Sequence, residues 1–489
     1  MTMTIRLSKS RYLAGLQCVK RLYLEIHARE LADEIDEGTQ AILDAGTRVG
    51  VLARERHPGG ALVDVEHFKI AEGLERTAVL LQDPSVPAIY DGFIQCDAVV
   101  VRPDLLVRTP GNRWRLIEVK STTRAKAEHR DDLAIQAHVL QGAGLTLEAS
   151  YLMHINGGYL YPGGPLDLTQ LFTEEDLTGE VAERQADIPG RLVEMRQMLA
   201  ASDPPAVEPD DHCFAPYECP FWSHCTQGKP ARWIQYLPGS RRTVQDLLAR
   251  GIQTIDDIPA GYPLHLIQRR VKDNAEWVGA GLRAALDTVE YPVHHLDFET
   301  VGSAIPLYPN TRPYQAIPFQ WSNHIETADG RLRHDAYLCA DARDPREELA
   351  VALLRSVGQT GSICTYTGYE RGVLLGLADV LPHLREDLVR VCDRIWDLHP
   401  LVKAHYYHPG FDGSYSIKSV LPAVVPALAY DDLEIQEGAL ASVQFARMAF
   451  GDGDATEKAR IRAALLAYCA RDTLAMVEVR RALRAKATP

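Results

Sequence analysis

The chain has 489 residues, of which 46% are hydrophobic and 24% are charged. This composition excludes a largely disordered protein and predicts two or three globular domains with substantial cores. The net charge of -14 argues against a broad basic surface for nucleic acid, but it does not exclude a local one, since clustered carboxylates at a metal site also lower the net charge.

The sequence shows no sign of a membrane segment or an export signal. It has no run of about 18 apolar residues, and its first residues lack the apolar stretch of a signal peptide. We therefore expect a cytoplasmic protein with no membrane partner. The nine cysteines are odd in number and unevenly spaced, so the clustered ones are better interpreted as metal ligands than as disulfides.

The first half of the chain changes from a helical to a strand pattern. Residues 1–85 are mostly helical in periodicity, with a break at residues 57–60, and a β pattern begins at Ile89. A helix is expected at residues 131–140 and a helical stretch at residues 174–198. The expected strands are residues 88–101, 105–109, 114–119 and 149–155.

The second half has the same mixture in another order. Residues 226–288 look helical and carry no recognisable chemistry, and a long final helix is expected at residues 457–485. Strands are expected at residues 293–298, 319–324 and 336–339. The fold class is therefore α/β, with two mixed-sheet domains at residues 1–226 and 290–489 and a small helical connector at residues 227–289.

A first group of charged residues follows the early strands. Asp104 precedes the strand at residues 105–109, and a turn joins that strand to the next one, so their ends come together. Glu118 and Lys120 lie two positions apart on this second strand, so both point to the same face. Asp104 and Glu118 could hold a divalent cation while Lys120 orients the attacking water. The alternative is an exposed hairpin edge with a surface ion pair.

The wider pattern resembles the PD-(D/E)XK nuclease superfamily, in particular its RecB-like branch and the iron-sulfur nucleases of CRISPR adaptation. The resemblance is carried by Pro103-Asp104, the apolar run before Glu118, Lys120, and Gln136 on the following helix. It implies a restriction-endonuclease-like sheet, metal binding by Asp104 and Glu118, and catalytic roles for Lys120 and Gln136. That branch usually supplies a metal-binding His from an upstream helix near a glycine pair, whereas here the corresponding stretch is residues 46–50 and the His nearest to it is His57.

Three cysteines lie within thirteen residues, at Cys213, Cys219 and Cys225, and Cys18 lies far upstream. Thiolates at this density suit an iron-sulfur cluster or zinc. The resemblance to the iron-sulfur nucleases implies that these four cysteines bind a 4Fe-4S cluster that closes the first domain. Zn²⁺ is the alternative, with His212 and His224 as spare ligands.

A second group of acids begins on a later strand. Asp297 and Glu299 are two positions apart and project from one face, and Tyr468 and Asp472 are four apart on the final helix. With Glu370 they provide the four carboxylates that two-metal phosphoryl chemistry needs. The set resembles the tyrosine-type DEDD exonucleases of the RNase H-like fold. The resemblance implies that Asp297, Glu299, Glu370 and Asp472 bind metal and that Tyr468 orients the water.

Three features near this group have more than one interpretation. Asp397 is the rival of Glu370, where the DEDD family normally has Asp. The aromatic stretch at residues 305–321 either stacks unpaired bases or packs into the core. Lys418 lies either near a phosphate or on the surface.

The order of motifs resembles a bacterial family that fuses these two nuclease types. The resemblance implies a metal-dependent nuclease that hydrolyses phosphodiester bonds with Mg²⁺ or Mn²⁺ at each site. The expected partner is nucleic acid, namely DNA with single-stranded ends, and DNA is preferred by family analogy alone. The alternatives are a nucleic-acid-binding adaptor with one or both sites inactive and an RNA-processing 3′ exonuclease.

Overall fold

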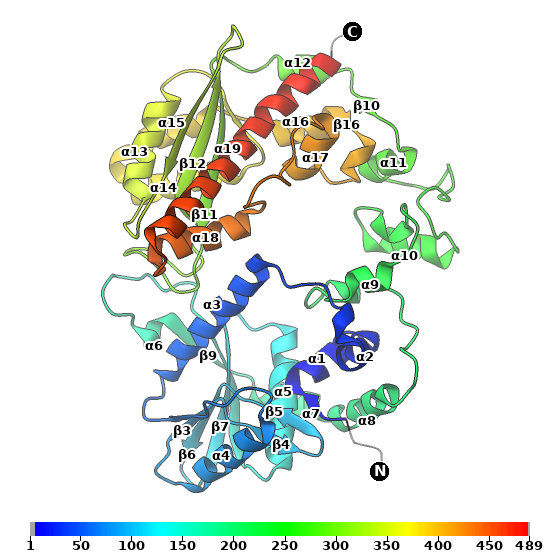
Figure 1. Ribbon diagram of the computed structural model, residues 1–489, viewed down its shortest axis with the longest axis vertical. Helices are drawn as coiled ribbons and strands as arrows, with labels where there is room; N and C mark the ends of the chain where they lie inside the picture. The colour runs from blue at the N-terminus through cyan, green and yellow to red at the C-terminus, as the bar shows by residue number, and fades with distance from the viewer. Residues whose placement is uncertain (1–4, 488–489) are drawn as a thin grey trace. The chain divides into compact units, whose positions relative to one another are not determined.

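The computed structural model describes residues 5–487, which fold into two compact α/β units (Figure 1). Unit 1 comprises Met1–Gly228 and Ser303–Tyr314, and unit 2 comprises Lys229–Gly302 and Gln315–Pro489. Each unit contains a mixed sheet with helices, which confirms the predicted fold class. A separate connector was expected at residues 227–289, but residues 229–289 belong to unit 2, and a short segment after Gly302 belongs to unit 1.

The central element of unit 1 is a six-stranded sheet of order β2-β3-β6-β7-β8-β9. Its inner strands are antiparallel between β6 and β7 and parallel between β7 and β8. A smaller sheet has the order β1-β5-β4. The strands are β1 (Leu7–Ser8), β2 (Ala61–Leu62), β3 (Ala88–Tyr90), β4 (Ile94–Cys96), β5 (Val99–Val101), β6 (Leu105–Thr109), β7 (Arg113–Lys120), β8 (Leu147–Ile155) and β9 (Phe172–Asp176).

Helices cover the six-stranded sheet, because its side chains alternate between two apolar cores. On β7, Leu116 belongs to the core that contains α5, whereas Ile117 and Val119 belong to the core that contains α3. The helices of unit 1 are α1 (Lys9–Gln17), α2 (Val19–His27), α3 (Glu37–Arg54), α4 (Ile70–Gln82), α5 (Ala127–Gly142), α6 (Leu168–Leu171), α7 (Thr178–Gln185), α8 (Ile188–Leu199) and α9 (Trp222–Thr226).

Two expected elements of unit 1 differ in the structure. Residues 88–101 form three short strands instead of one, since Asp91 and Asp97 adopt left-handed backbone conformations with φ of 56° and 45° that interrupt the extended chain. The helical stretch expected from Glu174 begins instead as strand β9, because its residues pair with β8. Tertiary pairing overrides local helix preference there.

Unit 2 is built on a five-stranded sheet of order β13-β12-β11-β14-β15. Strands β11, β12 and β13 are antiparallel neighbours. On the other side of β11, β14 pairs with β11 and β15 pairs with β14, both in parallel. The three strands predicted in this half are confirmed. The strands of unit 2 are β10 (Trp277–Val278), β11 (Val293–Val301), β12 (Ile317–Glu326), β13 (Leu332–Leu338), β14 (Ile363–Thr365), β15 (Ile395–Asp397) and β16 (Tyr406–Tyr407).

The predicted final helix is confirmed as α19, which packs across β11 and β12 (Figure 1). On the other face, Leu296 and Phe298 of β11 share a core with α13, α14 and α15. Because directions alternate along β11, Asp297 and Glu299 point away from that core. The helices are α10 (Arg241–Ala249), α11 (Leu266–Asp273), α12 (Leu282–Leu286), α13 (Arg346–Val357), α14 (Tyr369–Val380), α15 (Arg385–Asp393), α16 (Leu398–His405), α17 (Ile417–Val424), α18 (Gly438–Phe450) and α19 (Ala455–Lys486).

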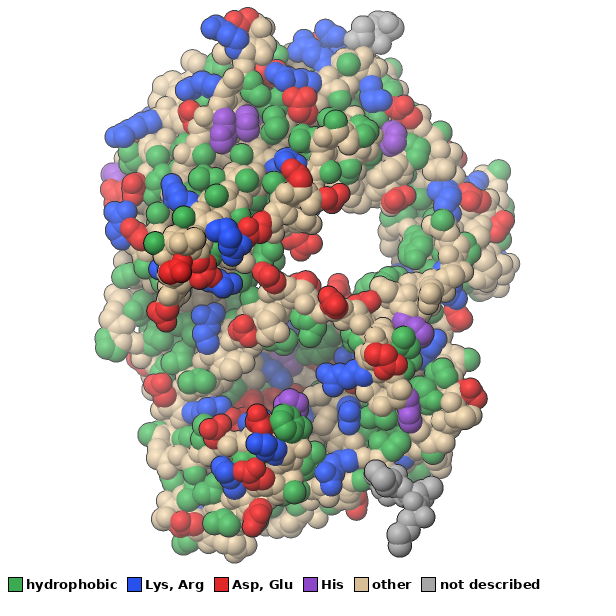
Figure 2. Space-filling view, in the orientation of Figure 1, with side chains coloured by type: hydrophobic (Ala, Val, Ile, Leu, Met, Phe, Trp, Pro, Cys, Tyr) green, Lys and Arg blue, Asp and Glu red, His purple; other side chains and the backbone are tan. Residues whose placement is uncertain are grey.

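The surface carries both signs of charge. In the view of Figure 2, acidic and basic side chains are interspersed on each unit. Among residues 5–487, no helix combines the length and the apolar character that crossing a membrane would require.

Candidate functional site

The first acid cluster lies in unit 1 between β7, α5 and the start of α1. Glu118 shares the face of β7 with Leu116, so it points to the side of the sheet that α5 covers. On α5, Asp132 and Gln136 are four residues apart and therefore lie on one face of the helix. All three side chains are buried. We call Asp104, Glu118 and Asp132 the first acid cluster.

Two lysines are inserted among these acids. Lys120 Nζ lies 2.6 Å from Oε1 of Glu118 and 2.8 Å from Oδ2 of Asp132. Lys9 Nζ, from the first residue of α1, lies 2.7 Å from the same Glu118 oxygen and 3.1 Å from Oδ1 of Asp132. The cluster therefore has two ammonium groups in direct contact with two of its three carboxylates.

The predicted residues Asp104 and Gln136 also join the cluster. Oδ2 of Asp104 accepts a hydrogen bond of 2.7 Å from the backbone N–H of Val119. Nε2 of Gln136 donates to Oε2 of Glu118 at 2.7 Å and to Oδ1 of Asp132 at 2.8 Å. His57, the histidine nearest to residues 46–50, does not join the cluster: its Nε2 lies 3.7 Å from Oε1 of Glu174.

The lysines control the charge states in this cluster. Burial, followed by the Glu118 charge, raises the pKa of Asp104 to about 7. Burial would also raise the pKa of Glu118, but the ammonium groups of Lys120 and Lys9 outweigh it and lower that pKa well below its usual value. Burial likewise raises the pKa of Asp132.

The four predicted cysteine ligands converge on one cavity of unit 1. Cys18 lies between α1 and α2, and Cys213 lies in a 3-10 turn. Cys219 lies just before α9, and Cys225 lies within it. All are free thiols. Backbone N–H of Cys219 donates to the carbonyl of Cys213 at 2.8 Å, which keeps the two side chains adjacent.

The chain ends of unit 1 meet at this cavity. Nε2 of Gln17 in α1 donates to the carbonyls of His212 and Tyr217 at 2.6 and 2.7 Å. Burial raises the pKa of Cys213 to about 11, and it raises the pKa of Cys219 and Cys225 as well. Binding of a metal or cluster would therefore release protons from these thiols.

The second acid cluster lies in unit 2 and consists of Asp297, Glu299, Glu370 and Asp472. Strand β11 presents the first two on the face that α19 covers, α14 supplies Glu370 in its first turn, and α19 supplies Asp472. Glu299, Glu370 and Asp472 are buried. The structure therefore brings together all four acids predicted for this half of the chain.

A cysteine lies beside two of these acids. One ligand atom each from Asp297, Glu299 and Cys469 lies within 4.8 Å of the other two. The sulfur of Cys469 lies 4.0 Å from Oδ2 of Asp297. Burial and the surrounding carboxylates raise the pKa of the Cys469 thiol.

Burial raises the pKa of all four acids, and neighbouring acids add to this effect at Asp297, Glu299 and Glu370. Burial, then the charges of Asp472, Glu299 and Glu370, raises the pKa of Asp297 well above its usual range. Burial and Asp472 do the same to the pKa of Glu299. Burial raises the pKa of Glu370 to about 7 and that of Asp472 to about 6. Such mutual repulsion is typical of a site that a cation relieves.

Three further side chains complete this site. Tyr430 donates a hydrogen bond of 2.6 Å to Oδ1 of Asp472. Tyr468 lines the same pocket one helical turn before Asp472, and Lys418 of α17 lines it from another side, 5.5 Å from the Tyr468 ring. The pocket has a volume of about 180 Å³. Burial, then Asp472, raises the pKa of Tyr468, so the phenol remains a hydrogen-bond donor at neutral pH.

The rival acid Asp397 has a different position. It caps α16, where its carboxylate accepts from the backbone N–H groups of His399 at 2.9 Å and Thr367 at 3.0 Å. Neither Asp397 nor Glu370 lines the small pocket beside Asp297, but the Glu370 carboxyl lies near enough to raise the pKa of Asp297. Glu370 is therefore the acid that the structure places with Asp297.

The aromatic stretch mostly packs into the core. Phe319 stacks on Phe445 with ring centroids 4.0 Å apart, Trp321 is buried, and Tyr308 is buried in unit 1. Tyr314 alone among these is substantially exposed, at 42%. The base-stacking interpretation of the stretch as a whole is therefore not supported by its burial.

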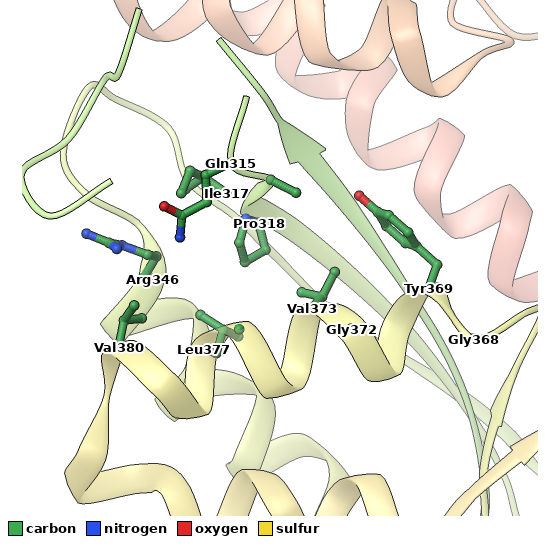
Figure 3. Close-up of a pocket in the computed structure, with 12 residues that line it drawn as sticks. Gln315, Ile317, Pro318, Arg346, Gly368, Tyr369, Gly372, Val373, Leu377 and Val380 are labelled. Atoms are coloured by element: carbon green, nitrogen blue, oxygen red, sulfur yellow. The ribbon is translucent and has the colours of Figure 1, made fainter. Parts of the chain in front are cut away.

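An apolar pocket of about 450 Å³ lies beside the second acid cluster along α14 (Figure 3). Val373, Leu377 and Val380 of the helix face Ile317 and Pro318 of β12, and Arg346 lies at one end. At the other end Tyr369, the neighbour of Glu370, shares a hydrogen bond of 2.6 Å with Thr300.

Four residues that lie at these sites were not predicted from the sequence: Lys9, Asp132, Tyr430 and Cys469. Asp132 had a usable signal, because it precedes Gln136 by four residues on a predicted helix. Lys9 had none, since 109 residues separate it from Glu118.

A comparison with protein families adds one observation. A family model described as a domain of unknown function (DUF2779) matches residues 294–416. This segment includes Asp297, Glu299 and Glu370 but ends before Lys418 and Asp472. A comparison with curated proteins gave no match.

Proposed function

We propose that this chain is a metal-dependent nuclease whose phosphodiester hydrolysis takes place at the second acid cluster. The observation that carries the proposal is the convergence of four carboxylates, three of them buried, from β11, α14 and α19: Asp297, Glu299 and Asp472 line one small pocket, and Glu370 acts on Asp297 beside it. The strand order β13-β12-β11-β14-β15 supports the RNase H-like fold that the resemblance to tyrosine-type DEDD exonucleases implies.

The residues of this cluster fit Mg²⁺ or Mn²⁺. The donors are carboxylate oxygens, which hard divalent cations prefer. Oε2 of Glu370 is buried and has no hydrogen-bond partner among the described residues. Asp297, Glu299, Glu370 and Asp472 would hold the ions. When bound, the ions would activate water and stabilise charge on the scissile phosphate.

The chain's own groups supply orientation and charge around the phosphate. The protonated phenol of Tyr468 faces the pocket and can hold the attacking water by a hydrogen bond. Tyr430 fixes the rotamer of Asp472 through its hydrogen bond. Lys418 places a positive charge at the mouth of the pocket, where a phosphate oxygen would bind.

The substrate proposal is DNA with single-stranded ends, and it rests on the family resemblance alone. The pocket of about 180 Å³ suits one phosphate with its flanking sugar, and the apolar pocket along α14 offers a surface for an unpaired base.

We propose that the four cysteines of unit 1 hold a 4Fe-4S cluster. Among the described residues, no three of their sulfurs lie within 4.8 Å of one another. A tetrahedral zinc ion with sulfur at about 2.3 Å needs sulfurs roughly 3.8 Å apart. A four-iron cluster binds each thiolate to a different iron, so its sulfurs are farther apart. The spacing favours the cluster, with a structural role.

The test is cleavage of end-labelled single- and double-stranded DNA and RNA with Mg²⁺ or Mn²⁺. Asp297→Asn should lower the rate at least about 100-fold. The matched control Asp379→Asn, an exposed acid of the same unit paired with Arg385, should cleave like the wild type. If Asp297→Asn cleaves normally while Glu118→Ala does not, catalysis belongs to unit 1 and the proposal fails. If the wild type cleaves nothing, the adaptor interpretation replaces it.

A further inference from the structure

The first acid cluster differs from the second in that its carboxylates already have cationic partners. Oε1 of Glu118 accepts from both Lys9 and Lys120, at 2.7 and 2.6 Å, and Oε2 accepts from Gln136 at 2.7 Å. Oδ2 of Asp132 accepts from Lys120 at 2.8 Å, and Oδ1 is shared by Lys9 and Gln136. Every oxygen of these two carboxylates therefore has a donor from the chain itself.

The geometry of the acids also disfavours a shared ion. In the part of the chain that the structure describes, oxygens of Asp104, Glu118 and Asp132 do not all lie within 4.8 Å of one another, whereas ligand atoms of Asp297, Glu299 and the adjacent Cys469 do. Lys9 and Lys120 lie between the acids, with 19% and 25% of their side chains exposed. A divalent cation would have to displace at least one ammonium group and its hydrogen bonds.

The second acid cluster shows the opposite arrangement. Among residues 5–487, no lysine or arginine nitrogen lies within 4.0 Å of the carboxylates of Asp297, Glu299, Glu370 or Asp472. Lys418 reaches only the edge of that pocket, where its ammonium donates to the backbone carbonyl of Gln436. A bound metal ion would there meet no competing cation in direct contact with its ligands.

We propose that Lys9 is a built-in cation that occupies the place of the divalent ion in the first acid cluster, so that unit 1 binds no Mg²⁺ or Mn²⁺ at Glu118. The residues present thus do not fit the metal that the PD-(D/E)XK resemblance implies. We assign this role to Lys9 rather than to Lys120. Lys120 is part of the PD-(D/E)XK motif, whereas the ammonium group of Lys9 is an additional positive charge that the motif does not include.

Lys9 is held firmly in this place. It is the first residue of α1, whose N-cap Ser8 accepts from the backbone N–H of Arg11 at 3.2 Å. The preceding residues pair with β5, with Leu7 opposite Val99. The start of α1 is therefore anchored to the small sheet, which keeps the Lys9 side chain within reach of the acids.

The experiment counts bound Mn²⁺ by electron paramagnetic resonance in full-length protein whose second cluster has been disabled by Asp297→Asn with Glu299→Gln. With Lys9 intact, this chain should bind no Mn²⁺ that depends on Glu118. Adding Lys9→Met should raise the Mn²⁺ affinity about 100-fold or more, since a unit charge in direct contact is removed. Adding Glu118→Gln should then abolish the new site.

Two controls address charge and position. Lys9→Arg keeps the positive charge and should bind no Mn²⁺, and Lys69→Met removes an exposed lysine of the same unit, paired only with Glu66, and should change nothing. The proposal is overturned if the Lys9-intact chain binds Mn²⁺ in a Glu118-dependent way, or if a folded Lys9→Met chain gains none. If Lys9→Met does not fold, the Lys9-intact count decides alone. Because the second cluster is disabled throughout, these outcomes are independent of the proposed nuclease activity.

Discussion

Nζ of Lys9 lies 2.7 Å from Oε1 of Glu118, although 109 positions separate the two residues in the sequence. The contact joins the start of α1 to a central strand of the unit 1 sheet. Asp297 and Glu299 in unit 2 have no such cationic partner among the described residues. The two acid clusters therefore differ in how their negative charge is balanced, and the following predictions separate them.

Asp297→Asn should stabilise the metal-free protein while it removes activity. Burial and three neighbouring acids raise the pKa of Asp297, so a neutral side chain of the same shape relieves repulsion. We expect the midpoint of thermal unfolding in EDTA to rise by about 2–4 °C. Added Mg²⁺ should stabilise the wild type more than the variant. A lower midpoint in EDTA would show that Asp297 makes favourable contacts as an anion.

Mn²⁺ affinity at the second acid cluster should rise with pH. The pKa of Asp472 is raised to about 6 and that of Glu370 to about 7, so both acids must lose protons before they bind an ion. We expect the dissociation constant to fall about 10- to 100-fold between roughly pH 5.5 and 7.5. A titration at several pH values measures it, and a flat profile would contradict the raised pKa values.

The same acids should make the metal-free protein less stable as pH rises. Their folded pKa values lie above the ordinary values of 3.8 and 4.5, so their contribution is most favourable below about pH 4, where both states are protonated. It is lost as the pH rises through about 6 to 7. Excess Mg²⁺ should remove this loss, which denaturant unfolding with and without the ion would measure.

Substitutions of Glu370 and Asp397 should have different effects on Mn²⁺ affinity and on stability. Glu370→Gln removes an acid of the second acid cluster, so we expect at least about a tenfold loss of Mn²⁺ affinity with little loss of stability. Asp397→Ala removes the cap of α16 and should cost about 1 kcal/mol in unfolding free energy, with Mn²⁺ affinity near that of the wild type. The reverse pattern would make Asp397 the ligand.

Cys18→Ala should remove the iron-sulfur absorption and weaken unit 1. In the proposed cluster, Cys18 would be the one ligand from the N-terminal helices, so its loss would remove the link from α1 and α2 to the distal cysteines. We expect loss of visible absorption and increased proteolysis near residues 200–230. Cys96→Ala, a cysteine outside this cavity, is the matched control. If Cys18→Ala kept normal iron content and held no zinc, the three remaining cysteines would suffice to bind the cluster, which would contradict the prediction.

Local periodicity was enough to predict much of the second acid cluster. Side chains two positions apart on a strand share a face, and those four apart on a helix share a face, so Asp297 with Glu299 and Tyr468 with Asp472 could be paired from spacing. The same rule placed Glu118 and Lys120 together. In each case the direction of the side chain depends on the backbone within one element.

The sequence by itself thus determined the α/β class, most of the strands and the acids that each element presents. Only the tertiary structure decided that Lys9 enters the first acid cluster, that Tyr430 holds Asp472, and that residues 88–101 divide between two sheets. The physical reason is that periodicity sets the direction of a side chain, whereas its partner depends on how distant elements pack. Charge balance is a property of that packing, so the difference between the two clusters could not be read from either motif.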